Sequence, residues 1–155
     1  MLGLSGLGQS ALAAIPGSAA QVTPVPLFRN LSWHQPYGTI GVRVRSVEAG
    51  VVKTGVKSYL VVPCNCNIVG MMLMADQVGS LVIDIYRTSF ANFPPTEGAS
   101  ITFGNRPTLS NARSMQDRAL INWTTALNKG DVLAFNVLSC SSITDFSLAL
   151  LVARA

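Results

Sequence analysis

From Thr39 onward the sequence is made of short strand-like runs, separated by turn-forming residues at roughly ten-residue intervals. In SLVIDIYR (80–87), Leu81, Ile83 and Ile85 fall on one face, which is the two-residue period of a half-buried strand. Many short strands at this spacing predict an all-β fold, an antiparallel β-sandwich of the jelly-roll kind. The runs are residues 39–47, 56–63, 67–76, 80–87, 118–127, 131–139 and 143–154.

Two of the turns between these runs have recognisable chemistry. DQVG (76–79) separates two runs closely enough to predict a hairpin between them. In NKGD (128–131), Asn and Gly tolerate positive φ, and Asp131 is able to bond back to the backbone. A single helical turn is conceivable only in SMQDRAL (114–120).

Residues 88–117 form a long connection with neither a strand nor a helix period. Connections of this length without structure of their own are uncommon in compact domains and are usually functional or disordered. We expect the segment to cross from one sheet to the other, stiffened by Pro94, Pro95 and Pro107. We predict that Phe90, Phe93 and Phe103 anchor it to the sandwich or to a neighbouring subunit.

The composition favours assembly with other subunits. Hydrophobic residues make up 49% of the 155 residues and charged residues 12%, against about 25% charged in average globular domains. A surface this poor in charge is expected to be buried against copies of the chain or other proteins. No apolar run approaches the ~18 residues of a membrane-spanning helix, so no membrane insertion is expected.

The first 36 residues differ from the rest and are predicted to be an extended N-terminal arm, followed by one β-sandwich domain at 37–155. The arm has no basic residue before Arg29, which does not suit a signal peptide. TPVPLF (23–28) favours an extended path, because proline restricts itself and the residue before it. We expect a neighbouring subunit to hold the arm, with packing on its own domain as the alternative. The predicted contacts are Leu2, Leu4, Leu7, Leu12, Ile15, Val25, Leu27 and Phe28.

The charged and sulfur-containing residues indicate no nucleic-acid, metal or cofactor site. Arg43 and Arg45 alternate with apolar residues, which indicates one solvent-exposed or interfacial strand face, so no nucleic-acid partner is expected. Cys64, Cys66 and Cys140 are expected to be free thiols, which suits synthesis in a reducing cytoplasm; a disulfide through Cys140 and a zinc site with His34 are the alternatives. Met71, Met72 and Met74 are expected to fill the core, as is the ring of Trp123 with its N–H paired.

The tests for catalysis fail. His34 is the single histidine, so no convincing Ser-His-Asp or Cys-His arrangement is available. The seven acidic residues are scattered, and turn roles explain most of them. GLSGLG (3–8) follows no strand and precedes no lysine, unlike a phosphate-binding loop. The chain is therefore not expected to be an enzyme or to need a cofactor.

The segment 54–152 resembles a domain common in virion structural proteins of tailed bacteriophages. The resemblance rests on the order and spacing of TGVKSYLVVP, ADQVGSLVIDIYR, NFPPT, RPTLSNA, INWTTALNKGDVLAFNV and ITDFSLALLV. It implies a β-sandwich found on tail or head fibres, spikes and head-decoration proteins, often as trimers, with no catalytic motif. Residues 1–36 fall outside the match.

The leading functional hypothesis is a capsid decoration or cement protein that attaches through its arm to the major capsid protein or another virion protein. This reading implies a homo-oligomer, with a trimer expected, made in the host cytoplasm and located in the virion. A neck, tail or baseplate component is the alternative structural role. A short fibre or spike module that binds host surface glycan is the alternative from another class, and its candidate residues are Trp33, Tyr37, Tyr59 and Tyr86. Arg113 is instead predicted to be an interface residue of the long connection, together with its three phenylalanines.

Overall fold

The computed structural model of the chain describes residues 36–155. The predicted contacts of the arm, together with Trp33 and His34, lie outside the described residues. No helix in the described part is long and apolar enough to cross a membrane.

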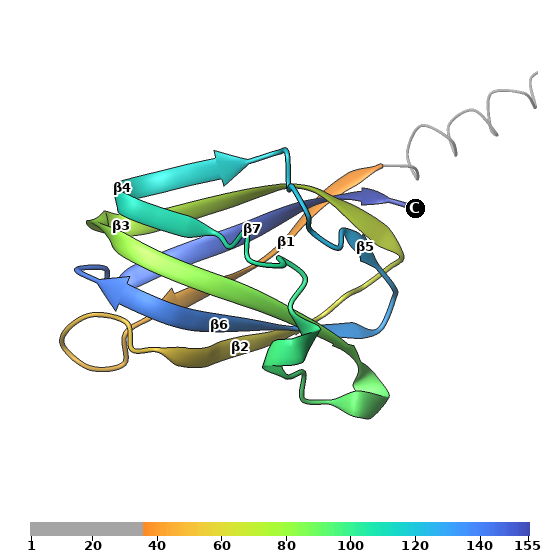
Figure 1. The fold of residues 1–155 in the computed structure, drawn as a ribbon, viewed down its shortest axis with the longest axis horizontal. Helices are drawn as coiled ribbons and strands as arrows, with labels where there is room; N and C mark the ends of the chain where they lie inside the picture. Colours follow the sequence, from red (N-terminus) through yellow and green to blue (C-terminus); the bar gives the residue numbers. More distant parts are fainter. Residues whose placement is uncertain (1–35) are drawn as a thin grey trace, which may run out of the picture. The chain divides into compact units, whose positions relative to one another are not determined.

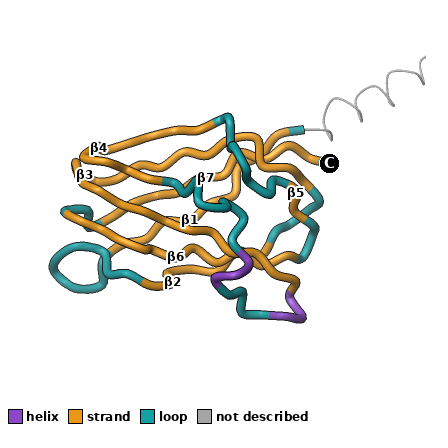
Figure 2. The backbone as a smooth tube through the Cα atoms, viewed as in Figure 1, coloured by secondary structure: helices purple, strands orange, loops and turns teal. Residues whose placement is uncertain are grey.

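The described residues form one antiparallel sheet that curls on itself (Figure 1). Its strands follow the order β1-β7-β3-β6-β2, and β4 and β5 pair with β3. Two short 3-10 turns, η2 (Phe90–Asn92) and η3 (Glu97–Ala99), follow β3 and are the purple segments of Figure 2. The strands are β1 (Tyr37–Arg45), β2 (Gly55–Val61), β3 (Cys66–Ser89), β4 (Thr108–Asp117), β5 (Ala126–Leu127), β6 (Asp131–Ser141) and β7 (Asp145–Arg154).

Strand β3 is two arms joined by a bend. Its first arm pairs with β7, from Cys66 opposite Arg154 to Ala75 opposite Phe146. Its second arm, 80–89, pairs with β6 from Ser141 back to Asp131. The ladder with β6 continues along β3 into the ladder with β7. In Figure 1 the β3 ribbon turns back on itself between the two arms, so the arms run in opposite directions.

The predicted turn at 76–79 is therefore confirmed as the bend of β3, but the predicted hairpin is wrong. The arms take β7 and β6 as their partners, with β4 on the other side of each. The reason is that the β6 and β7 strands come from the far end of the chain and offer each arm a full antiparallel ladder. Local sequence shows the two arms but not these distant partners.

Strand β4 bends together with β3. Residues 108–112 pair with 79–82 in the second arm, and residues 114–117 pair with 71–74 in the first. The long connection was predicted to cross from one sheet to the other as an irregular segment, but its last part, Thr108–Asp117, is the strand β4. Residues 90–107 link two strands that are neighbours, the second arm of β3 and the first half of β4.

The position of β4 contradicts two further predictions. The helical turn proposed for 114–120 is absent, and the strand predicted over 118–127 contains only the two paired residues of β5. The buried or half-buried apolar positions of β4 are Leu109, Ala112 and Met115. Their spacing is three and not two because the backbone bends at Asn111, which has φ +50°. A bent strand does not show the period-two signal used to find it.

The core lies inside the curl and is filled by one face of each long strand. Leu81, Ile83 and Ile85 are fully buried, as the alternation predicts. Strand β7 alternates in the same way and buries Phe146, Leu148, Leu150 and Val152. The indole ring of Trp123 is also buried, and its N–H donates to the Asn105 carbonyl at 2.8 Å, which confirms the expected packing.

The turn at 128–131 is confirmed in its chemistry. Gly130 has φ +89°, a left-handed conformation that favours glycine. The carboxylate of Asp131 accepts a hydrogen bond from the Asn128 N–H at 2.9 Å. The methionine prediction holds only in part, because Met71 is buried whereas Met74 is 46% exposed.

Candidate functional site

The outward face of β2, β6 and the second arm of β3 is where polar and aromatic side chains gather. Asp84 lies in the middle of a strand and points outward, opposite in sense to Ile83 and Ile85. Its side chain is nevertheless only 3% exposed, because residues 100–106 lie across it. Sequence reasoning assigned most acidic residues to turns, and this one is an exception.

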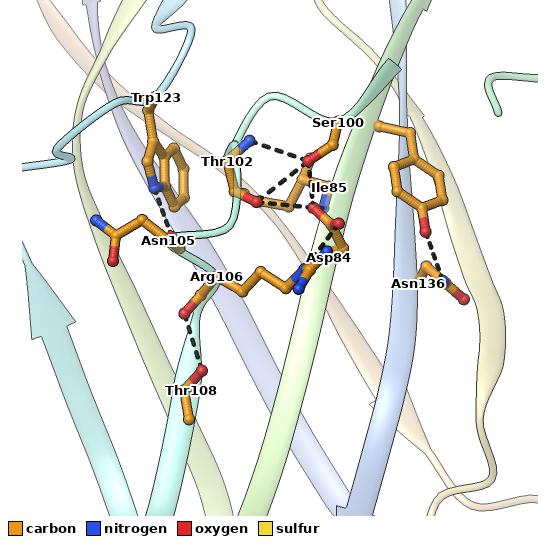
Figure 3. A network of polar contacts seen from close by, with 10 residues as sticks. Asp84, Ile85, Ser100, Thr102, Asn105, Arg106, Thr108, Trp123 and Asn136 are labelled. Atoms are coloured by element: carbon orange, nitrogen blue, oxygen red, sulfur yellow. Dashed lines mark hydrogen bonds and ion pairs between the residues drawn. The ribbon is translucent and has the colours of Figure 1, made fainter. Parts of the chain in front are cut away.

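Four donors converge on the Asp84 carboxylate (Figure 3). Its Oδ1 accepts from the Ser100 hydroxyl at 2.7 Å, the Thr102 hydroxyl at 2.8 Å and the Ile85 N–H at 2.8 Å. Its Oδ2 accepts from the Arg106 Nε–H at 3.0 Å. A buried carboxylate is tolerated only when it is paired and hydrogen-bonded, and both conditions are met here.

Burial alone raises the pKa of Asp84, but the hydrogen bonds from Ser100, Arg106 and Thr102 together outweigh it. The pKa therefore lies below the usual aspartate value, and the group is a carboxylate at neutral pH. All its accepted bonds come from the chain itself. Asp84 thus fastens the connection to the sheet, and its geometry does not suit a general acid.

An apolar anchor accompanies this polar one. Ile101 is buried, and its N–H donates to the Ile85 carbonyl at 2.9 Å. Pro95 and Pro107 are buried as well. The predicted anchors Phe90 and Phe103 are instead 72% and 65% exposed, so these phenyl rings do not pin the segment to its own sheet. In the sequence, the apolar side chain of Ile101 was the one indication that this residue anchors the connection.

Phe103 stands at the tip of a constrained turn. Its φ is +46° and that of Gly104 is +88°, so a non-glycine residue occupies the left-handed region at a cost of about 1–2 kcal/mol. The turn is held by the Asn105 N–H, which donates to the Thr102 carbonyl at 2.9 Å, and by the Asn105 side chain, which donates to the Ile121 carbonyl at 3.1 Å. The surrounding hydrogen bonds therefore fix a strained backbone whose phenyl ring faces solvent.

A hollow of about 390 Å³ opens beside this turn. Leu138 and Phe103 provide apolar surface, while Arg106 and Glu97 provide charge. The Arg106 side chain is 41% exposed, and its Nε–H is already committed to Asp84. The remaining lining residues are Asp84, Tyr86, Gly98, Ser100 and Gly104.

A second feature of the same outward face is apolar. We call Tyr59, Val61, Phe90 and Phe93 the aromatic patch. The rings of Tyr59 and Phe93 meet edge to face with centroids 4.8 Å apart. Tyr59 and Val61 are two apart on β2, an end strand of the sheet, so they share a face; every member of the patch is exposed.

The structure separates the remaining predicted site residues. Tyr86 is buried, with its hydroxyl accepting from the Asn136 amide at 2.8 Å, so its ring is not available for stacking on a ligand. Tyr37 is 70% exposed on β1, the opposite end strand from that of Tyr59. Arg113 lies on β4, where its Nε–H donates to the Ala75 carbonyl at 3.3 Å, away from the aromatic patch.

The basic residues of β1 lie on a solvent-exposed face, which is one of the two predicted alternatives. Asp145 accepts from Arg43 at 2.6 Å and from Arg45 at 3.1 Å, and both arginine side chains are exposed. The hydrogen bond from Arg43 is the largest cause that lowers the pKa of Asp145, to about 2. Both arginines are therefore partly neutralised by one carboxylate of β7.

The cysteines of the chain are free thiols. Burial raises the pKa of the Cys66 and Cys140 thiols, which disfavours the reactive thiolate. Within residues 36–155, no three His, Cys, Asp or Glu side chains gather closely enough to hold a metal ion.

No family model matches the chain, and no curated protein matches it. Among solved structures, the capsid of Ralstonia phage GP4 is similar at 10% identity and a TM-score of 0.46, over 80% of this chain and 88% of that one. A serine protease of Aeromonas sobria in complex with its chaperone is similar at 10% identity and a TM-score of 0.33, over 84% of this chain but 29% of that one. Likenesses this weak establish neither a family nor a function.

Proposed function

We propose that the chain is a non-enzymatic structural subunit of a tailed-bacteriophage virion, with capsid decoration as its role. The observation that carries the proposal is the aromatic patch, together with the resemblance of residues 54–152 to phage virion domains. Phe90 and Phe93 extend from a connection that is fastened rigidly to the sheet through Asp84 and Ile101. A fixed apolar surface is what a subunit in a permanent assembly needs.

The strand arrangement supports the finer fold assignment. Around the bend of β3, one set of neighbours is β1, β7, the first arm and residues 114–117. The other set is β2, β6, the second arm and residues 108–112. We infer that these two four-membered sets correspond to the two sheets of a jelly roll, an architecture that includes viral capsid domains.

The energetics of the aromatic patch suit attachment. Burying a large apolar side chain contributes on the order of 1.5–3 kcal/mol. The four members of the patch are from 47% to 72% exposed, so the isolated chain obtains only part of this burial free energy from them. Binding to a neighbouring virion protein would bury these side chains and remove their apolar surface from water.

The arm supplies a second set of apolar contacts in this proposal. Its eight predicted contact residues would bind the major capsid protein or another copy of the chain, so that attachment combines two weaker sites. Linked sites reinforce each other because the second binds at a high effective concentration. A homo-oligomer, with a trimer expected, would multiply the effect again.

The test is the presence and stoichiometry of the chain in purified phage particles, measured by quantitative mass spectrometry against the major capsid protein. A fixed ratio, with antibody label distributed over the head, is expected. Label confined to the neck, tail or baseplate would replace decoration by that alternative. Absence of the chain from particles would overturn the virion role itself.

The aromatic patch is tested separately with the paired substitutions Tyr59→Ser and Phe93→Ser. Both side chains are already half-exposed, so the fold should survive. The double variant is expected to bind particles that lack the chain much more weakly than the unaltered protein does. Tyr37→Ser removes a more exposed tyrosine from the opposite end strand and is the matched control. Equal loss with the control would assign the effect to general surface change.

A further inference from the structure

We propose that the hollow beside Phe103 binds a neutral hexopyranose unit of a glycan. This goes beyond the structural role proposed above and does not depend on it. The hollow is lined by none of the glycan candidates that the sequence suggested, except the buried Tyr86.

The first support is the position of Phe103. Phe103 combines a strained backbone, at φ +46°, with a phenyl ring that is 65% exposed. The turn keeps this conformation because hydrogen bonds through Asn105 and Thr102 fix both sides of it. Strained and rigidly supported residues cluster at ligand sites, where the strain is part of pre-organisation.

The second support is the composition of the hollow. A pyranose ring has an apolar C–H face and a rim of hydroxyl groups, so it needs a flat apolar surface next to fixed polar groups. Phe103 and Leu138 offer the apolar surface. Arg106 is oriented by its bond to Asp84, and no other hydrogen bond of its guanidinium is formed within the described residues. Its terminal N–H groups would donate to sugar hydroxyls, and Glu97 would accept from them.

Charge and size select a neutral sugar. The Asp84 carboxylate is balanced by Arg106, which leaves Glu97 as the unbalanced charge of the lining. An acidic sugar would therefore be repelled. A hollow of about 390 Å³ is within the ordinary range of small-molecule sites and accommodates one ring of a longer glycan.

The experiment is a titration of the full chain, by saturation-transfer NMR, with the methyl glycosides of glucose, galactose, mannose and N-acetylglucosamine. A ligand of this size is expected to bind with a dissociation constant in the millimolar range. Binding of at least one of them is expected. No binding of any of the four at about 20 mM would overturn the proposal, because a single-ring site of this kind should be occupied at that concentration.

Two variants locate the binding. Phe103→Gly keeps the left-handed backbone while removing the ring, and it should abolish binding. Glu97→Gln keeps the shape and should weaken binding about tenfold. Tyr37→Ala, which removes an exposed aromatic ring outside both the hollow and the aromatic patch, is the matched control and should leave sugar binding unchanged. Sugar binding that survives in Phe103→Gly would assign Phe103 to another role and refute the glycan site.

Discussion

Replacing Asp84 by Asn removes one acceptor from the network that fastens residues 100–106 to the sheet. The amide oxygen of Asn still accepts at the Oδ1 position, whereas its NH₂ group would face the Arg106 Nε–H, which donated to Oδ2 at 3.0 Å. One hydrogen bond to a charged group contributes about 1.5–3 kcal/mol. Arg106 is 41% exposed and is able to turn toward water, which limits any further cost. We therefore expect a loss of about 2–3 kcal/mol.

Denaturant unfolding of the full chain measures this loss, and thermal unfolding should show a decrease in Tm of about 10 °C. The effect should depend on pH in a defined direction. Because the pKa of Asp84 is lowered in the folded protein, its contribution is present above the unfolded value near 3.9 and is lost as pH falls through the lower folded pKa. The difference between the two proteins should thus be constant from about pH 5 to 7 and shrink below about pH 4.

Asp145→Asn is the control, because that carboxylate also pairs with arginine but its partners are exposed. Its effect at neutral pH should be the smaller of the two, since exposed ion pairs contribute little. If Asp84→Asn is as stable as the unaltered protein to within ~0.5 kcal/mol, the network is not what holds the connection. A loss that persists unchanged at low pH would equally contradict the electrostatic reasoning.

Three further substitutions test the packing and the charges. Gly41→Ala should lower the free energy of unfolding by about 1–3 kcal/mol in denaturant, because the added Cβ would overlap the backbone of β7. Gly38→Ala should be neutral, because the nearest atom to its added Cβ is 3.9 Å away. Equal effects of the two substitutions would contradict this geometry. Trp123→Phe should cost about 1 kcal/mol by the same measurement, for the lost bond to the Asn105 carbonyl, and an unchanged stability would mean that water replaces it. The pKa of Asp145 is about 2 in the folded protein and near 3.9 in the unfolded chain, so the unaltered protein should lose stability as pH falls between these values. Asp145→Asn should lose less stability over the same range in acid titrations followed by circular dichroism. Parallel curves would rule out linkage between this carboxylate and folding.

The sequence by itself determined the class of the fold, most of the strands and the local turns. Alternation identified the inward face of 80–87, and Gly130 with Asp131 marked a turn whose hydrogen bond is formed as expected. These features depend on residues within a few positions of each other. A short window of sequence is therefore enough to predict them.

Tertiary structure alone decided which strands pair and what covers the outward face. The arms of β3 take partners that are more than forty residues away along the chain, and β4 lost its periodic signal by bending at Asn111. Asp84 has the sequence position of a solvated residue, yet it is buried because the connection folds back over it; Phe103 has the character of a core residue, yet its turn presents it to water. The chemistry of a residue determines whether it needs hydrogen-bond partners or burial. The packing of distant segments determines whether protein or water surrounds it.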